Sequence, residues 1–182
     1  MKKLLVLTAL VFAGFSNLAL SQEVRTVANV DLTRYVGNWY EVARFPNHFQ
    51  KDCAANVTAQ YNKRADGEID VINRCKKADG KIDEVVGRAR VDNSQTNAKL
   101  KVSFASNWLN WLPFIWADYW IIDLAQDYSL VAVSDASRDY LWVLSRTPGI
   151  ADADYEALVN RVTAQGFDTA RLVKTVQEKA AK

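Results

Sequence analysis

Few side chains in this sequence are suited to acid–base, nucleophilic or metal chemistry. The chain of 182 residues has one histidine, His48, and two cysteines, Cys53 and Cys75. A general base needs an oriented partner, and a structural zinc site needs about four ligands such as cysteine and histidine. The sequence places no nucleophile beside His48 and no carboxylates in a spaced pair. We therefore predict that the protein is not an enzyme and holds neither a metal nor a cofactor.

The first 21 residues have the pattern of an export signal, in which Lys2 and Lys3 precede an apolar run over residues 4–14 and Gln22 follows the cleavage site. We expect an exported, periplasmic protein with one domain over residues 22–182. Cleavage of the signal would remove two of the 23 basic residues, and the remaining 21 would equal the 21 acidic ones, so the mature chain would have no net charge. A neutral chain has no field to attract a polyanion, so no nucleic-acid partner is expected.

Export also bears on the two cysteines, because a pair in an oxidising compartment usually forms a disulfide. This favours a bond between Cys53 and Cys75. Regular hairpin register places Cys75 opposite position 58, however, about five residues from Cys53. A bulge or folded loop would have to close that gap, so the pairing stays open at this point.

The elements that must position any site are short strands separated by turn signals. Asp66-Gly67 and Asp79-Gly80 favour tight hairpins, as expected of an antiparallel barrel or sandwich. The eight predicted strands cover residues 39–46, 55–63, 68–75, 83–91, 98–105, 117–124, 128–134 and 139–146.

A single helical pattern occurs near the end of the chain. Apolar residues at positions 155, 158, 159 and 162 share one helical face, behind Asp152 as an N-cap and ahead of Gly166 as a stop. We predict one helix packed outside the sheet and a frayed tail from Glu178 onward.

Three segments resemble the signature regions of the lipocalins. Residues 35–43 (YVGNWYEVA) are similar to the first region, residues 117–123 (ADYWIID) to the second and residues 139–148 (DYLWVLSRTP) to the third. The residues of the third region are most similar to those of bacterial lipocalins and their apolipoprotein D relatives. The resemblance spans roughly residues 30–175. It implies an all-β fold: an eight-stranded antiparallel up-and-down barrel with one C-terminal α-helix packed outside.

The resemblance also implies structural roles for three residues. The indole of Trp39 would plug the closed end of the barrel, with the Arg146 guanidinium across it as a cation–π contact and Gly37 allowing the close approach. Bacterial relatives often carry a lipid-attachment cysteine at the end of the signal, and in the stretch of this chain that would hold it, residues 11–15 (VFAGF), Phe15 takes its place. A free periplasmic protein, at most peripheral to the outer membrane, is therefore expected.

Side chains alternate between the inside and the outside along each strand, so the inward positions of Trp39 and Arg146 predict which other residues line the barrel. The set is mostly apolar, with aromatic hydroxyls near one end, and its small members are expected to leave a cavity. The residues predicted to bind the ligand are Ala43, Val57, Ala59, Tyr61, Val71, Asn73, Val85, Gly87, Leu100, Val102, Phe104, Tyr119, Tyr140 and Trp142. Glu41 lies two residues after Trp39 on the same strand, so we expect it to point inward as well, toward a ligand head group or Arg146.

The connection at residues 105–116 is rich in aromatic residues and has no charge. It would lie at the open mouth, where such residues favour a membrane, a ligand lid or a protein contact. A loop folded back on its own barrel is the alternative. The predicted membrane or lid residues are Trp108, Trp111, Phe114 and Trp116.

An apolar chamber with few polar groups suits a molecule with an alkyl tail and a polar head. We expect a monomeric or weakly dimeric carrier of a small hydrophobic ligand, either a fatty acid or a lysophospholipid. Alternatives are a carrier of haem, bilin or another pigment, and a membrane-surface protein acting through the 105–116 loop. A thiol isomerase of the kind found among lipocalins would need a free Cys75, which a disulfide would remove.

Overall fold

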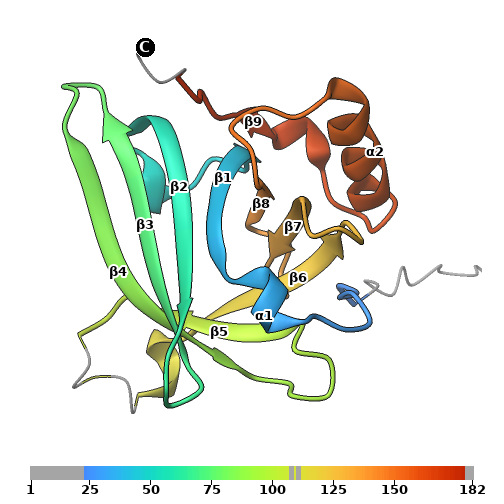
Figure 1. Ribbon diagram of the computed structural model, residues 1–182. Helices are drawn as coiled ribbons and strands as arrows, with labels where there is room; N and C mark the ends of the chain where they lie inside the picture. Colours follow the sequence, from blue (N-terminus) through green and yellow to red (C-terminus); the bar gives the residue numbers. More distant parts are fainter. Residues whose placement is uncertain (1–22, 107–108, 110–111, 179–182) are drawn as a thin grey trace, which may run out of the picture.

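The computed structural model describes residues 23–106, 109 and 112–178. The predicted signal at residues 1–21 and the tail beyond residue 178 lie outside this part of the chain. The elements form a β-barrel with one long helix against its outer wall (Figure 1). The helices and short helical turns are α1 (Leu32–Tyr35), η1 (His48–Gln50), η3 (Pro113–Ile115), α2 (Asp152–Thr163) and η4 (Thr169–Arg171).

Each of the eight predicted strands is present within a few residues of its expected ends. The strands are β1 (Gly37–Arg44), β2 (Cys53–Lys63), β3 (Ile69–Lys77), β4 (Ile82–Val91), β5 (Lys99–Ser103), β6 (Ala117–Leu124), β7 (Leu130–Ser134), β8 (Leu141–Ser145) and the unpredicted β9 (Val173–Lys174). Consecutive strands pair antiparallel, and β1 pairs with both β8 and β2, which closes the barrel. The prediction of an eight-stranded antiparallel barrel is confirmed.

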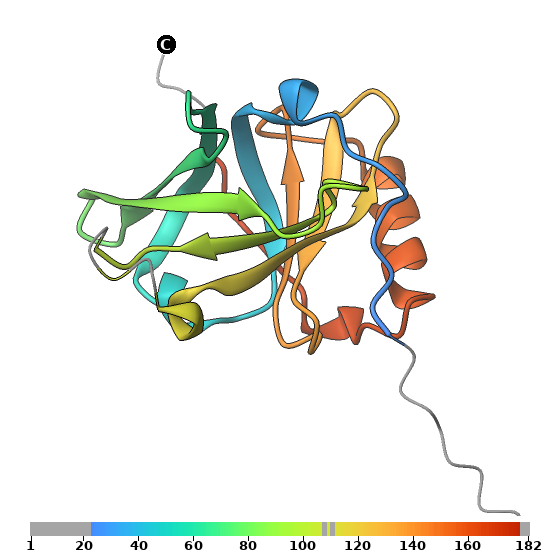
Figure 2. The ribbon, with the colours of Figure 1, turned by 90° about the horizontal axis from the view of Figure 1, so that it is seen from below.

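Two apolar clusters hold this structure together. The first lies inside the barrel, because it draws one or more residues from every strand β1 to β8 and includes the fully buried Trp39. The second lies between the barrel wall and α2, whose Leu158 and Val162 are 1% and 0% exposed. Figure 2 shows α2 on the outside of the wall formed by β6, β7 and β8.

The helix is confirmed, and one detail of its start is wrong. Asp152 is the first helical residue, and Ala151 occupies the N-cap without a side-chain hydrogen bond. An acidic residue is still favourable there, since it lies in the first turn near the positive end of the helix dipole. Gly166 has a φ of +86°, the left-handed conformation that commonly follows a helix end.

None of the helices among the described residues is long and apolar enough to cross a membrane.

Candidate functional site: the barrel interior and its mouth

The closed end of the barrel has the arrangement that the signature residues implied. The Arg146 guanidinium lies 3.8 Å from the Trp39 ring centroid. It also donates to the carbonyls of Arg34, Tyr35 and Asn38 at 2.6–3.0 Å. Gly37 has a φ of +100°, and a Cβ atom there would lie 3.4 Å from Arg146 Nη1. The guanidinium therefore fastens α1 and the start of β1 across the barrel floor.

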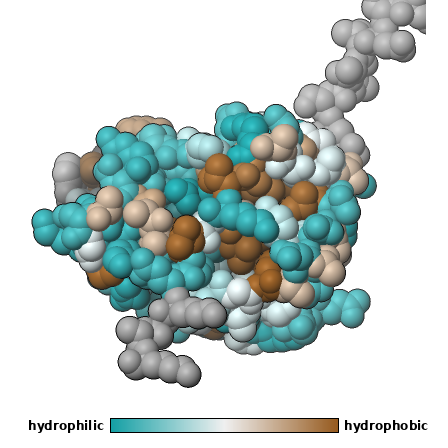
Figure 3. All heavy atoms as spheres, turned by 90° about the horizontal axis from the view of Figure 1, so that it is seen from above, coloured by the Kyte–Doolittle hydropathy of each residue, from teal (hydrophilic) through white to brown (hydrophobic). Residues whose placement is uncertain are grey.

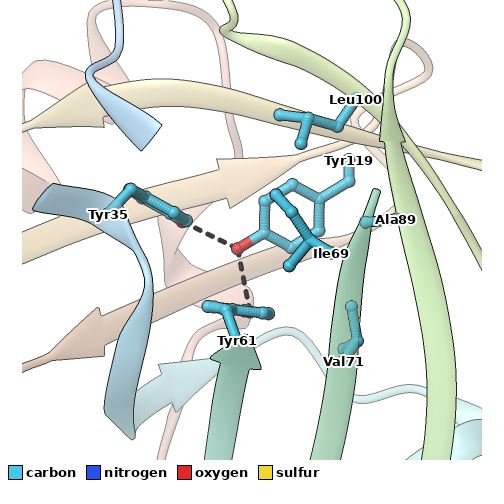
Figure 4. Close-up of a pocket in the computed structure, with 7 residues that line it drawn as sticks. All are labelled: Tyr35, Tyr61, Ile69, Val71, Ala89, Leu100 and Tyr119. Carbon is cyan, nitrogen blue, oxygen red and sulfur yellow. Dashed lines mark hydrogen bonds between the residues drawn. The ribbon is translucent and has the colours of Figure 1, made fainter. Parts of the chain in front are cut away.

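Three tyrosines form a hydroxyl cluster just above this floor. The Tyr119 hydroxyl lies 2.7 Å from that of Tyr35 and 2.9 Å from that of Tyr61. Figure 4 marks these two hydrogen bonds with dashed lines. Burial raises the pKa of Tyr61 to about 12 and raises the pKa values of Tyr35 and Tyr119 well above the usual 10. All three phenols thus stay protonated at neutral pH.

The space beside this cluster is small. Ile69, Val71, Ala89 and Leu100 complete its lining (Figure 4), and about 10 Å³ is open to the centre of a water molecule. That volume holds about one water-sized group. The deep end of the barrel is therefore filled mainly by side chains, and room for a larger molecule must lie nearer the mouth.

Toward the mouth, the inner face is open. Val85 lies on β4, two residues before Gly87 and four before Ala89, which are both buried. Because β4 pairs regularly with β3 and every second residue of a strand faces the same side, the Val85 side chain points inward. It is nevertheless 44% exposed, and Phe104, which continues the inward row of β5, is 42% exposed. These two inward side chains near the mouth are therefore not covered by other parts of the chain.

Most of the predicted lining residues have the expected direction. Ala59, Tyr61, Val71 and Leu100 belong to the inner cluster, and Val102, Tyr119 and Trp142 pack against it. Asn73 pairs with Ala59 and with Val85, and Val57 is buried on β2. Tyr140 lies at the rim, with its ring stacked on Trp142 at 5.6 Å. Binding by these residues remains a prediction.

The expected inward direction of Ala43 is wrong. The register of β1 against β8 shifts between Glu41 and Ala43, so Glu41 pairs with Leu144 inside while Ala43 pairs with Val143 in the cluster under α2. Such a bulge adds one residue to a strand and reverses its alternation. Phe45, two residues after Ala43, joins the same outer cluster.

The role expected of Gly87 also needs correction. Its missing side chain was expected to leave cavity volume, but a Cβ atom there would lie 2.5 Å from both the Phe104 ring and the carbonyl oxygen of Ser103. The ring of Phe104 occupies the space. Gly87 therefore allows β5 and Phe104 to approach β4, and it enlarges no cavity.

The bulge in β1 creates a buried polar cluster that the sequence did not predict. Because alternation reverses at the bulge, Glu41 and Arg44 both point inward, and Nη1 of Arg44 lies 2.8 Å from the Glu41 carboxylate. Glu41 is 2% exposed and also accepts from Gln50 Nε2 at 2.6 Å and from the Thr175 hydroxyl. Its inward direction is confirmed, but its cationic partner is Arg44 and not Arg146.

The C-terminal segment completes the mouth. The pairing of β1 with β2 ends at Tyr40 and Thr58. Nearer the mouth, the C-terminal segment lies between these two strands. Its strand β9 pairs with β1, and its Val176 carbonyl accepts a hydrogen bond from the backbone of Asn56 on β2. The expectation that the tail frays from Glu178 is wrong for that residue, because its carboxylate accepts from Asn56 and from Lys76 at 3.0 Å or less.

The two cysteines form a disulfide, with 5.6 Å between their Cα atoms. The register of β2 against β3 shifts twice, between Cys53 and Ala55 and again between Ala55 and Thr58. These irregularities close the gap that regular pairing leaves. Cys75 is therefore not a free thiol.

The aromatic loop divides into buried and exposed parts. Phe114 is 80% exposed, whereas Trp116 is 8% exposed beneath the Arg90 guanidinium, 4.1 Å from its ring centroid. The prediction that Trp116 is a membrane or lid residue is therefore wrong, because its side chain is buried. Trp108 and Trp111 lie outside the described residues. Figure 3 shows hydrophobic groups toward the middle of the upper face, set among hydrophilic ones.

A closed eight-stranded barrel with a Trp–Arg floor, an apolar interior and an open mouth defines a class of ligand-enclosing barrels. Comparison with known proteins identifies the family: residues 30–177 match the model of the lipocalin-like domain. The chain belongs to the lipocalin family.

Relatives with similar sequences include bacterial, plant and animal proteins. The chain is 37% identical to the outer membrane lipoprotein Blc of Escherichia coli over 177 residues, covering 94% of this chain and 96% of the relative. It is 35% identical to temperature-induced lipocalin-1 of Arabidopsis thaliana, covering 86% and 84%. It is 32% identical to apolipoprotein D of Macaca fascicularis, covering 96% and 95%.

Solved structures support the fold. Insecticyanin from the tobacco hornworm Manduca sexta aligns with a TM-score of 0.68 at 15% identity, over 88% of this chain and 87% of that one. Lobster apocrustacyanin A1 aligns with a TM-score of 0.64 at 17% identity, over 87% and 92%.

Proposed function

We propose that this protein is a non-catalytic carrier that encloses the alkyl chain of a fatty acid or lysophospholipid in the bacterial envelope. The observation that carries the proposal is the open inner face near the mouth, where inward apolar side chains remain exposed. Each buried methylene of a ligand would gain about 0.8 kcal/mol there. Relatives in Escherichia coli and Vibrio cholerae are named outer membrane lipoproteins, which supports an exported, envelope location.

A titration of delipidated mature protein tests the proposal. Palmitate, lysophosphatidylethanolamine and haemin would each be added while tryptophan fluorescence is followed, with native mass spectrometry giving the stoichiometry. We expect saturable one-to-one binding of the two acyl compounds. Binding of haemin alone would replace the proposal with a pigment carrier, for which the stacked Tyr140 and Trp142 offer a planar surface.

Adjacent residues of β4 provide a matched pair of variants. Val85 points inward and Val86 outward, and their exposed fractions are 44% and 56%. Val85→Glu places a charge against the enclosed chain and should weaken palmitate binding at least about tenfold, because burying an unpaired carboxylate is costly. Val86→Glu adds the same charge to the outside and should leave binding within about twofold. Equal effects of the two variants would refute binding inside the barrel.

We further propose that the mouth touches a membrane through its exposed aromatic residues. Phe49 and Phe114, both in connections at this end, are 65% and 80% exposed. Aromatic side chains at a water-exposed edge are suited to a lipid interface. Liposome flotation should weaken for Phe114→Ser and for a Trp108→Ala, Trp111→Ala variant. Unchanged flotation would leave the loop without a membrane role.

A further inference from the structure

Arg44 uses only one side of its guanidinium. Arginine has five N–H donors in a planar fork. Nη1 donates to Glu41 Oε1 at 2.8 Å and to Thr175 Oγ1 at 3.2 Å. Nε is buried without an acceptor among the described residues, and no hydrogen bond from Nη2 is found there either. The two donors of the edge formed by Nε and Nη2 therefore have no acceptor there, and neighbouring protein atoms cover Nε.

This edge is the one that binds planar anions with two parallel hydrogen bonds. The chain contains an example on its surface, where Arg161 donates from Nε and Nη2 to the two carboxylate oxygens of Asp123 at 2.7 and 2.9 Å. In Arg44 the same pair of donors has no such partner. Glu41 does not compete for it, since its oxygens already accept from Arg44 Nη1, Gln50 and Thr175.

The position of Arg44 suits a group entering from the mouth. Arg44 pairs with Trp142 across β1 and β8, so both side chains share the inner face, and Trp142 packs against the inner apolar cluster. The Arg44 side chain is 14% exposed. An alkyl chain lying along the apolar wall would end near this guanidinium.

We infer that the edge of Arg44 that has no acceptor is the head-group site of the barrel and takes an anion, a carboxylate or a phosphate, attached to an alkyl chain. The inference rests on the proposed function and specifies its ligand. Thr175 and Glu41 hold the opposite edge and keep the guanidinium directed inward. The anion binds without any covalent step.

Paired ligands of equal chain length test the site. Palmitate and hexadecanol differ in the head group, and the wild-type protein should bind palmitate about tenfold or more tightly, as expected for a charge-assisted hydrogen bond. Arg44→Lys keeps the charge beside Glu41 but loses the fork, and it should reduce this preference severalfold. Arg44→Met combined with Glu41→Gln leaves no unpaired charge and should abolish it while hexadecanol still binds.

Arg74→Lys is the matched control, because Arg74 is on β3 and pairs with Glu84 on the outer surface. Its preference for palmitate should equal that of wild type. Equal binding of palmitate and hexadecanol by wild type, or a preference that survives the double substitution, would overturn the inference. Displacement of palmitate by inorganic phosphate alone would overturn it as well, since the site would then take free anions. Failure of both long-chain ligands to bind would instead refute the carrier function.

Discussion

The buried tyrosine cluster predicts that stability declines at alkaline pH. Ionisation of Tyr61 shifts from the usual pKa of 10 to about 12 in the folded protein. The unfolded chain therefore loses this proton first, and the free energy of unfolding falls as the pH rises between 10 and 12. Below pH 10 the contribution is fully present. At 1.36 kcal/mol per pKa unit, it amounts to about 3 kcal/mol for Tyr61, of which about 1.4 kcal/mol is lost by pH 11.

Tyr35 and Tyr119 act in the same direction, because burial raises the pKa of each. The assay is urea unfolding followed by far-UV circular dichroism at pH 8, 9, 10 and 11, with absorbance at 295 nm reporting phenolate. Tyr61→Phe should show a shallower decline than wild type. Ile69→Val, in the wall of the same cavity, should lower stability by about 1 kcal/mol without changing the decline. A wild-type free energy that stays constant between pH 9 and 11 would refute the reasoning.

Three further changes test other parts of the barrel. Replacing Cys53 and Cys75 by serine opens a loop with a sequence separation of 22, and unfolding in urea should require about 3 kcal/mol less, as loop-closure entropy predicts; an unchanged midpoint would contradict this. Arg146→Met removes the cation–π contact with Trp39 and the donors to four backbone carbonyls, so a loss of about 2 kcal/mol or more is expected in the same assay. Gly87→Ala forces a Cβ against the neighbouring ring and backbone; thermal unfolding should shift down by several degrees, equivalent to about 1–3 kcal/mol, and an equal or higher midpoint would show that the strand can relax.

The strands and the helix were predictable because their signals are local. Alternation of apolar residues, Asp-Gly turns and one helical face lie within short windows of sequence. The floor contact between Trp39 and Arg146 was also predictable, but through resemblance to the lipocalins, since the two residues are more than 100 positions apart. Their 3.8 Å approach confirms that inference.

Predictions of side-chain direction from strand alternation were wrong where a strand departs from regular pairing. One extra residue in β1 sends Ala43 to the outer cluster and turns Arg44 inward, and no local pattern marks that bulge. The same limit left the disulfide open, because two register shifts in β2 bring Cys53 to Cys75. Register depends on the contacts of both partner strands, which a single strand's sequence does not contain.

The sequence by itself determined the strand order, the apolar interior and the residues of the barrel floor, because each follows from periodicity, turn chemistry or a signature motif. Only the tertiary structure decided how the mouth is built. Arg44, Gln50 and Thr175 come from a strand, a short helical turn and the C-terminal segment, and they meet at Glu41 because the chain closes on itself there. Burial of a carboxylate requires partners from several directions, and those partners are brought together only by the closed fold.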